Sequence, residues 1–301
     1  MIVRGAFNHL LRPGLRSDFR DSYLSFEKEW PDIVRTGTMD RAELEATTIS
    51  GLPRQVILPE GEAFTIIDPK LADKIVFADT QYGNGLSIST EMMEDDLYDR
   101  ANQSAKWLGR STNLIQEYIV SDLLDDAFAG STFTGLQAEA LCTATHTLLS
   151  SGSTWSNQIS GDPQLGVLGL QAAFELGETT VDHTDDPVPV RIDKLIVNIA
   201  GEWMARQLTL NEQEPFTADR NINAARSKRQ LSWQVSHYKD QTGKDWFARD
   251  SQLHDAHLLF KVRPQFPDWF DDSTRSAFFA SRQRFLVYFY DQRGWIGSNA
   301  T

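Results

Sequence analysis

The sequence predicts an α+β fold, and three segments carry this prediction. Residues 91–129 place apolar side chains mostly at three- and four-residue steps, the pattern of an amphipathic helix. Residues 51–89 divide into short β-type runs separated by turn residues. Residues 285–290 alternate as a strand does. Both faces of that last strand are apolar, so we expect both to be covered.

Composition and charge limit the function. The chain has 301 residues, enough for one large domain or two modest ones. Its net charge of −13 argues against a dedicated nucleic-acid-binding surface, which needs a dense Lys and Arg footprint. The same charge is compatible with a protein that encloses nucleic acid without gripping it.

The sequence also argues against a disulfide bond, a signal peptide and a membrane-spanning segment. Cys142 is the single cysteine, so no intrachain disulfide forms. The first residues lack the apolar core of a signal peptide, and no run is long enough to span a membrane. We therefore expect a soluble protein that is made in the cytoplasm.

The N-terminal residues 1–50 predict a peripheral arm. Residues 17–30 space their aromatic side chains like one face of a short helix, which Pro31 ends. Such a helix packs either on its own domain or on a neighbouring subunit.

The next segment predicts a projecting hairpin. Residues 54–58 and 63–67 are predicted strands around a turn at residues 59–62, and residues 74–78 and 86–89 are two more strands. The hairpin has a polar tip and little apolar surface to bury by itself. We expect it to find its partner on another molecule.

A long helix follows. Glu91, Glu94, Asp95 and Asp96 lie in its opening turns, where carboxylates complement the helix dipole. From residue 103 to 128 it would span roughly 40 Å, which is long for a compact domain. Gly109 marks either a bend or a close packing point.

The rest of the chain alternates loops with shorter elements. Residues 130–165, 179–189 and 211–228 are predicted loops. Helices are predicted at residues 165–175 and 200–210, and strands at 194–198, 233–238, 246–249, 257–262 and 285–290.

Candidate chemistry is sparse. Cys142 and His146 are four residues apart and could form a nucleophilic pair, but no orienting carboxylate is near them in sequence. His254 and His257 would point apart on a strand, so a metal site there is not expected.

An acidic loop carries the remaining candidate. His183 with Asp182, Asp185 and Asp186 lacks the regular spacing of a calcium loop. The carboxylates at the start of the long helix are better explained by their favourable interaction with the positive end of the helix dipole than by acid/base catalysis. The sequence therefore predicts no catalytic, cofactor-binding or metal-binding residues.

The order of the elements resembles the major capsid proteins of tailed phages of the Hong Kong 97 type. The segments that carry this resemblance are the arm (1–50), the hairpin loop (51–80), the strand leading to the long "spine" helix (82–96), the spine helix (103–128), the loop after it with His146 and Trp155-Ser156-Asn157 (141–157), the axial strand and helix (194–197 and 201–210), the axis-proximal loop (217–223), the return at Trp246-Phe247, and the closing strand and tail (284–290 and 291–295). The resemblance covers essentially the whole chain.

The resemblance implies a domain plan. Residues 1–50 would be an N-terminal arm, 51–80 an extended hairpin loop, 81–130 a peripheral domain with the spine helix, 131–240 an axial domain, and 241–301 the return strands of the peripheral domain.

It also implies a structural function without enzymatic activity or cofactors. The chain would assemble with itself into pentamers and hexamers of an icosahedral shell, enclosing double-stranded DNA without sequence-specific binding and without a membrane. A separate scaffolding protein is expected because Met1 already lies in the arm. A portal and decoration proteins are further partners. The protein would be located in the virion, after assembly in the host cytoplasm.

Some members of that family cross-link their subunits through Lys and Asn. Lys70 and Lys74 lie in or near the hairpin loop, but nothing marks a catalytic Glu or an acceptor Asn, so no cross-link is expected. Two alternatives remain open: an encapsulin-like compartment shell, which shares the fold, and an acidic hydrolase of unknown type.

Overall fold

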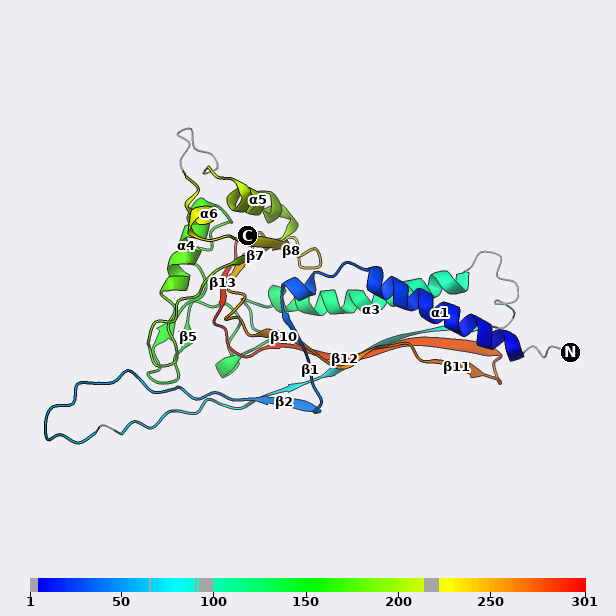
Figure 1. Cartoon of the computed structure of the whole chain (residues 1–301), viewed down its shortest axis with the longest axis horizontal. Helices are drawn as coiled ribbons and strands as arrows, with labels where there is room; N and C mark the ends of the chain where they lie inside the picture. Colours follow the sequence, from blue (N-terminus) through cyan, green and yellow to red (C-terminus); the bar gives the residue numbers. More distant parts are fainter. Residues whose placement is uncertain (1–4, 65, 90, 92–99, 214–221) are drawn as a thin grey trace.

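The computed structural model describes residues 5–64, 66–89, 91, 100–213 and 222–301. The molecule is elongated. A long sheet beneath two helices extends to one side, a smaller α/β unit stands at the other end, and a long loop projects below that unit (Figure 1).

The long sheet is built around one central strand. Its members are β1 (Arg35–Thr38), β4 (Thr80–Ser89), β10 (Ala256–Gln265), β11 (Asp268–Asp271) and β12 (Ser276–Phe289). β12 pairs antiparallel with β4 along one edge, and with β10 and β11 along the other. β1 joins β10 in parallel at the outside. The predicted strands at 86–89, 257–262 and 285–290 are confirmed, and all three are longer than predicted.

One face of β12 is covered by the long helix α3 (Arg100–Asp125), which begins and ends three residues before the predicted spine helix at 103–128. Every second residue of β12 is buried, from Ala277 to Phe289. Two of them are polar and pair with the helix: Thr112 Oγ1 donates to Ser281 Oγ at 2.8 Å, and the side-chain amide of Gln116 donates to that of Gln283 at 2.7 Å.

The opposite face of β12 is only half-buried, for example at Leu286 and Tyr288. The prediction that both faces of this strand are covered is therefore confirmed for one face and met only in part for the other, where the Tyr288 ring packs against Phe77 and His257.

Helix α1 (Gly5–Ser25) lies along α3. A methyl group on Gly109 of α3 would come within 2.7 Å of the carbonyl oxygen of Phe19, so Gly109 permits the close approach of the two helices. Of its two predicted roles, close packing is the one observed.

The predicted helix at residues 17–30 is correct in type but wrong at both ends. The helix ends at Ser25, and a separate 3₁₀ turn, η1 (Trp30–Asp32), follows. The buried carboxylate of Glu117 on α3 accepts the backbone N–H groups of Glu29 and Trp30 and holds the chain in this turn. Side-chain periodicity does not record such a long-range contact.

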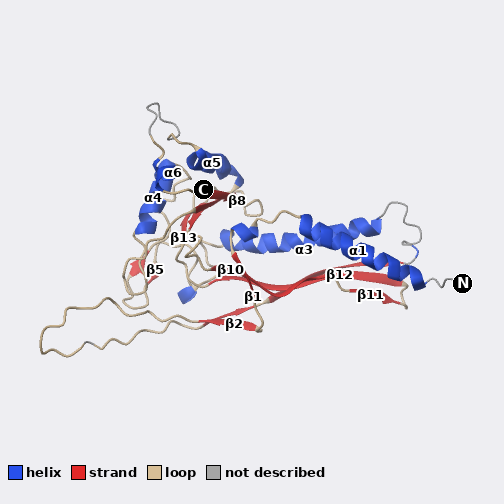
Figure 2. Ribbon diagram, viewed as in Figure 1, coloured by secondary structure: helices blue, strands red, loops and turns tan. Residues whose placement is uncertain are grey.

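A long loop projects from a short two-stranded base. β2 (Glu43–Ala46) pairs antiparallel with β3 (Ile75–Ala78), and the loop runs between them, drawn in tan in Figure 2. The predicted turn is present, since Glu62 N–H donates to Pro59 C=O at 3.3 Å.

The strands predicted at 54–58 and 63–67 are wrong: the described residues of both arms form no ladder. Beyond the base, one bridge joins Ile49 to Leu71. Among the described residues, no layer of the chain covers residues 54–58 or 63–67, and an isolated hairpin is marginal in water.

The smaller unit has a four-stranded sheet with the order β13-β9-β7-β8. Its strands are β7 (Lys194–Val197), β8 (Ser232–Val235), β9 (Trp246–Arg249) and β13 (Trp295–Ser298), and its helices are α4 (Val167–Glu178), α5 (Glu202–Leu210) and α6 (Ala224–Lys228). Small pieces complete the chain: η2 (Leu136–Ala138), β5 (His146–Thr147), β6 (Thr154–Trp155) and η3 (Ile199–Gly201). The helix α6 falls in the predicted loop at 211–228.

Strand pairing differs from the predicted boundary at residue 241. β9 and β13 lie within 241–301, yet β9 pairs antiparallel with β7, and β13 with β9, so neither joins the long sheet. All eight residues of the two strands are buried. The prediction that Trp246-Phe247 starts the return to the long sheet is wrong; that return begins at β10.

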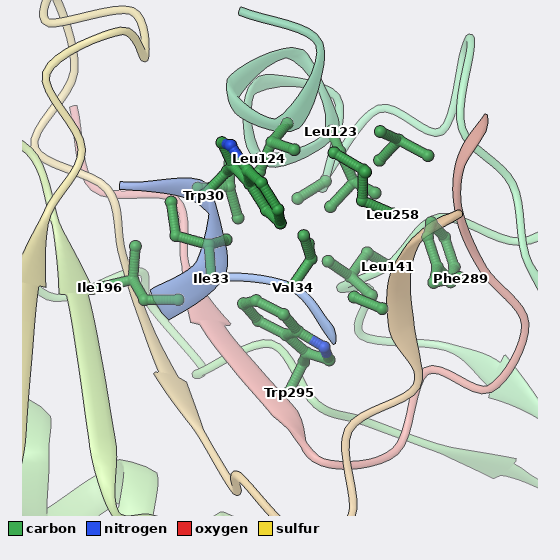
Figure 3. Close-up of a cluster of buried hydrophobic side chains, with 14 of the residues drawn as sticks. Trp30, Ile33, Val34, Leu123, Leu124, Leu141, Ile196, Leu258, Phe289 and Trp295 are labelled. Atoms are coloured by element: carbon green, nitrogen blue, oxygen red, sulfur yellow. The ribbon is translucent and has the colours of Figure 1, made fainter. Parts of the chain in front are cut away.

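The two sheets and the long helix share one hydrophobic core. Figure 3 shows Trp30 and Val34 from the N-terminal segment, Leu123 and Leu124 from α3, and Trp295 from β13 converging. Ile196 of β7 and Phe289 of β12 belong to the same cluster. The smaller unit and the long sheet are therefore tied together through buried side chains.

Candidate functional site

The candidate nucleophile Cys142 is inert. Its side chain is fully buried, and burial raises the pKa of the thiol far above its usual range. A methyl group on Gly297 would come within 2.8 Å of the Cys142 sulfur, so the thiol fills a tight core position. A thiol held neutral is a poor nucleophile.

His146 is engaged elsewhere. Its Nδ1 lies 2.8 Å from Glu139 Oε2, and its Nε2 lies 2.8 Å from Asn157 Oδ1. The amide N–H₂ of Asn157 donates to the carbonyls of Leu141 and Gln292, which fixes the orientation of the amide. Both ring nitrogens are thus occupied, and His146 does not serve Cys142 as a base.

Glu139 corrects the expectation that no orienting carboxylate is near in sequence: it lies seven residues before His146. The same carboxylate accepts the backbone N–H of Thr147, and the His146 ring stacks on Trp155 at 4.6 Å. This network pins the loop that follows α3. Only the fold brings its members together.

The other histidine candidates are also structural. His254 is buried, and burial followed by the nearby Arg249 lowers its pKa to about 3. His257 contacts Asp255 at 2.9 Å and stacks on Tyr288. Within the described residues, no group of three or more His, Cys, Asp or Glu side chains could hold a metal ion.

The acidic loop satisfies its own charges. Asp182 Oδ1 accepts the backbone N–H groups of Thr184 and Asp186, and His183 lies against Arg293. Burial, reinforced by the positive charge of Arg293, lowers the pKa of His183. Asp185 has a left-handed backbone (φ 70°), typical of a tight Asx turn.

The acidic start of the long helix is mostly outside the described residues. Glu91 is described and exposed, whereas Glu94, Asp95 and Asp96 are not described. Their predicted role at the helix dipole stays a prediction. In the part of the chain that the structure covers, no helix is both long and apolar enough to cross a bilayer.

The main unexplained surface is the projecting loop at residues 47–74. It exposes large apolar side chains along both arms: Ile49, Leu52, Val56, Ile57, Leu58, Phe64, Ile66, Ile67 and Leu71. Ile57, Phe64 and Ile66 are 94%, 83% and 89% exposed. Single exposed apolar residues are ordinary, but a continuous set marks an interaction site.

The root of the loop is held by its own chain. Lys70 Nζ donates to the carbonyl of Ser150 at 2.7 Å, and Arg54 lies 3.8 Å from Asp186. The Arg54 side chain is exposed, so this second contact contributes little.

A buried carboxylate sets the angle at which the loop leaves the sheet. Asp79 lies between β3 and β4, its side chain is 2% exposed, and it pairs with Arg284 at 2.6 Å and Lys261 at 3.1 Å. Burial acts to raise the pKa of Asp79, but the two cationic hydrogen-bond donors outweigh it and hold the pKa below its ordinary value. The sequence offered no signal for this anchor, because its partners lie on β10 and β12.

A groove of about 820 Å³ opens beside the loop root. Its walls come from β3, the end of α3 and the end of β12, and include Phe77, Ile119 and Tyr288. Asp122 and Asp125 lie among the lining residues; burial, followed by the charge of Asp125, raises the pKa of Asp122. The groove therefore has an apolar wall and a polar, partly acidic margin.

The Glu117 clamp gives a testable pH dependence. Burial, together with the charge of Glu29, raises the pKa of Glu117 from 4.5 to about 7 although two backbone N–H groups oppose the change. Because the folded-state pKa is raised, ionisation costs stability as the pH rises from about 4.5 to 7, and the cost is constant above that. A pKa change of this size corresponds to about 3 kcal/mol.

We therefore expect Glu117→Gln to flatten the pH dependence of unfolding. Urea unfolding of the unassembled protein at pH 5 and pH 8 should show the wild type losing stability relative to the variant as the pH rises. The exposed neighbour Glu27, changed to Gln, is the control and should follow the wild type. Parallel pH curves for wild type and Glu117→Gln would contradict the assignment.

Comparison with known proteins identifies the fold. No protein-family model matches the chain, and no curated protein matches its sequence. Among solved structures, the chain is similar to the capsid of cyanophage P-SCSP1u, with TM-score 0.61, 12% identity, and coverage of 92% of this chain and 90% of that one. A virus-like particle from Pyrococcus furiosus matches with TM-score 0.52 at 8% identity, over 95% and 98% of the two chains.

The capsid of an empty GTA particle matches with TM-score 0.53 at 11% identity, over 94% and 97% of the two chains. These likenesses cover nearly the whole chain on both sides. They confirm the predicted Hong Kong 97-type capsid fold.

Proposed function

We propose that this chain is the major subunit of a closed icosahedral shell that encloses packaged double-stranded DNA. The observation that carries the proposal is the whole-chain likeness to the cyanophage capsid. The fold alone does not fix a function. The exposed apolar loop supplies the independent support.

The loop at 47–74 suits a contact between copies. Its apolar side chains have no cover within the described part of their own chain, and burying each one contributes about 1.5–3 kcal/mol. On a neighbouring copy, these apolar side chains would lie against the apolar wall of the groove beside β3. Many such contacts acting together stabilise a large assembly without one dominant site.

Each part of the chain has its own role in this proposed shell. Residues 1–50 form the arm, and 51–80 the extended loop. The long helix α3 and the long sheet, apart from its outer strand β1, form the peripheral domain, and α1 of the arm lies along α3. The smaller unit around β7, with β9 and β13 added to it, forms the axial domain that meets at the centre of pentamers and hexamers.

The role is structural rather than catalytic. The candidate nucleophile Cys142 is buried, and His146 is fully hydrogen-bonded. The net charge of −13 favours holding DNA by confinement, since an acidic wall repels phosphates. A separate scaffolding protein, a portal and decoration proteins are the expected partners, with assembly in the host cytoplasm before the shell becomes part of the virion.

Sedimentation of the purified protein, alone and with its scaffolding protein, tests the proposal. We expect a discrete particle of many copies, in addition to smaller rings. A chain that stays monomeric under both conditions at high concentration would overturn the proposal. That result would instead favour the alternative hypothesis of an acidic hydrolase, which would be a monomer or a small oligomer.

A compartment shell without DNA is the second candidate. The likeness to the virus-like particle from Pyrococcus furiosus favours it, since the two chains share the fold over nearly their whole lengths. The content of particles isolated from the native source separates the candidates: nuclease-protected DNA supports the capsid, and an enclosed protein cargo supports the compartment.

A further inference from the structure

Two faces of the smaller unit have complementary shapes and charges but lie on opposite flanks. α5 contacts β8, and α4 contacts β13; β8 and β13 are the two edge strands of the sheet order β13-β9-β7-β8. Figure 1 shows α4 and α5 on opposite sides of this unit. α6 contacts both helices, but Trp203 on α5 stays exposed, so it does not fill the pocket beside α4 in its own copy of the chain.

The α5 flank carries an aromatic knob beside a positive charge. Trp203, Arg206 and Leu210 are exposed at three- and four-residue steps, so they share one face of the helix. Trp203 is 73% exposed, which is unusual for the largest apolar side chain. Arg206 has no ion-pair partner among the residues that the structure describes.

The α4 flank carries a hole beside a negative charge. A pocket of about 270 Å³ lies between α4 and α6, lined on its apolar side by Val167 and Phe174 of α4 and, at its floor, by the buried Leu208 of α5. That volume suits one large side chain. Glu175 and Lys228 also line the pocket, and Lys228 Nζ is already held 2.6 Å from Glu178.

Glu175 is the charge left available on that flank. Its Oε1 accepts a hydrogen bond from the side chain of Gln171 at 2.8 Å, and no cation pairs with it within the described residues. An Arg beside an exposed Trp on one flank thus corresponds to a Glu beside an apolar hole on the other.

We propose that Trp203 of one copy enters the α4–α6 pocket of the next copy, and that Arg206 pairs there with Glu175. The contact joins unlike faces, so it is heterologous and repeats until a ring closes. This inference rests on the proposed shell function and names the residues that specify the ring. A tryptophan anchor in a pocket with a charged neighbour is the usual composition of an interface hot spot.

Charge exchange tests the pairing. Arg206→Glu and Glu175→Arg each place like charges together, so each should lower the yield of rings and shells at least tenfold. The double variant restores the pair in reverse and should recover to within about threefold of wild type, because coupled residues are non-additive. Trp203→Ala should lower the yield at least as much as either single reversal.

A mismatched double variant controls for net charge. Arg206→Glu with Glu27→Arg has the same net charge as the rescuing pair, but Glu27 lies outside both flanks, so this variant should stay defective. Thermal unfolding of each unassembled variant should match wild type, since Arg206 and Glu175 are exposed.

Three results would overturn the inference while leaving the shell function intact. They are wild-type yield for Arg206→Glu, wild-type yield for Trp203→Ala, or a double variant no better than its two single parents. Failure of the wild-type protein to assemble at all would instead overturn the proposed function.

Discussion

Replacing Ile57, Phe64 and Ile66 together with serine should abolish shell formation while leaving the folded chain intact. These side chains are almost fully exposed in one copy, so the substitutions remove nothing from its core. If the loop is buried against a neighbour, the variant loses at least about 4 kcal/mol per copy, roughly a thousandfold in affinity. Sedimentation reports the loss of shells, and thermal unfolding of the unassembled protein should be unchanged.

The same loop offers a matched control. Gln55, Glu60 and Glu62 are exposed polar residues, and changing all three to serine alters the loop without removing apolar surface. That variant should still assemble. Wild-type shell yield from the Ile57, Phe64 and Ile66 variant would mean that the loop does not make the assembly contact.

Trp295→Ala should lower the free energy of unfolding by about 3–5 kcal/mol, the usual cost of deleting a buried aromatic side chain. Trp295 is fully buried in the core shared by both sheets and the long helix (Figure 3). Its ring meets Phe247 edge-on at 6.2 Å and lies under the guanidinium of Arg249 at 5.8 Å. Urea unfolding of the unassembled protein measures the change.

A second tryptophan provides the comparison. Trp203→Ala removes the same side chain from an exposed position, so unfolding of the unassembled protein should change by less than about 0.5 kcal/mol. Trp295→Phe keeps most of the packing and should fall between the two. A loss below about 1 kcal/mol for Trp295→Ala would contradict a core that ties the two sheets together.

The elements with strong local patterns were predictable. The long helix has many apolar residues at helical steps, and residues 285–290 alternate clearly. The structure confirms both elements. The turn at 59–62 is confirmed because its Pro and Gly act locally. Periodicity and turn chemistry need no knowledge of distant residues.

The errors occur where distant residues decide the structure. The strands predicted at 54–58 and 63–67 are wrong because no layer of the chain, in the part that the structure describes, covers them. Trp246-Phe247 fits either sheet by composition, and only its pairing with β7 assigns it. Periodicity extended the first helix to Trp30, whereas the buried Glu117 bends the chain before that residue.

The site chemistry follows the same rule. Cys142 and His146 are close in sequence, yet Glu139 and Asn157 determine what His146 does. Asp79 joins its cationic partners only when β3, β10 and β12 are assembled. The sequence analysis expected no catalytic role for the first pair; its statement that no carboxylate is near in sequence is wrong, because Glu139 contacts His146.

Cryo-electron microscopy of the assembled protein tests the central claim most directly. We expect a closed icosahedral shell of this chain, in which residues 47–74 of each copy lie on a neighbouring copy and their apolar side chains are buried. Particles that are not closed shells, or shells in which this loop stands free in solvent, would contradict the claim.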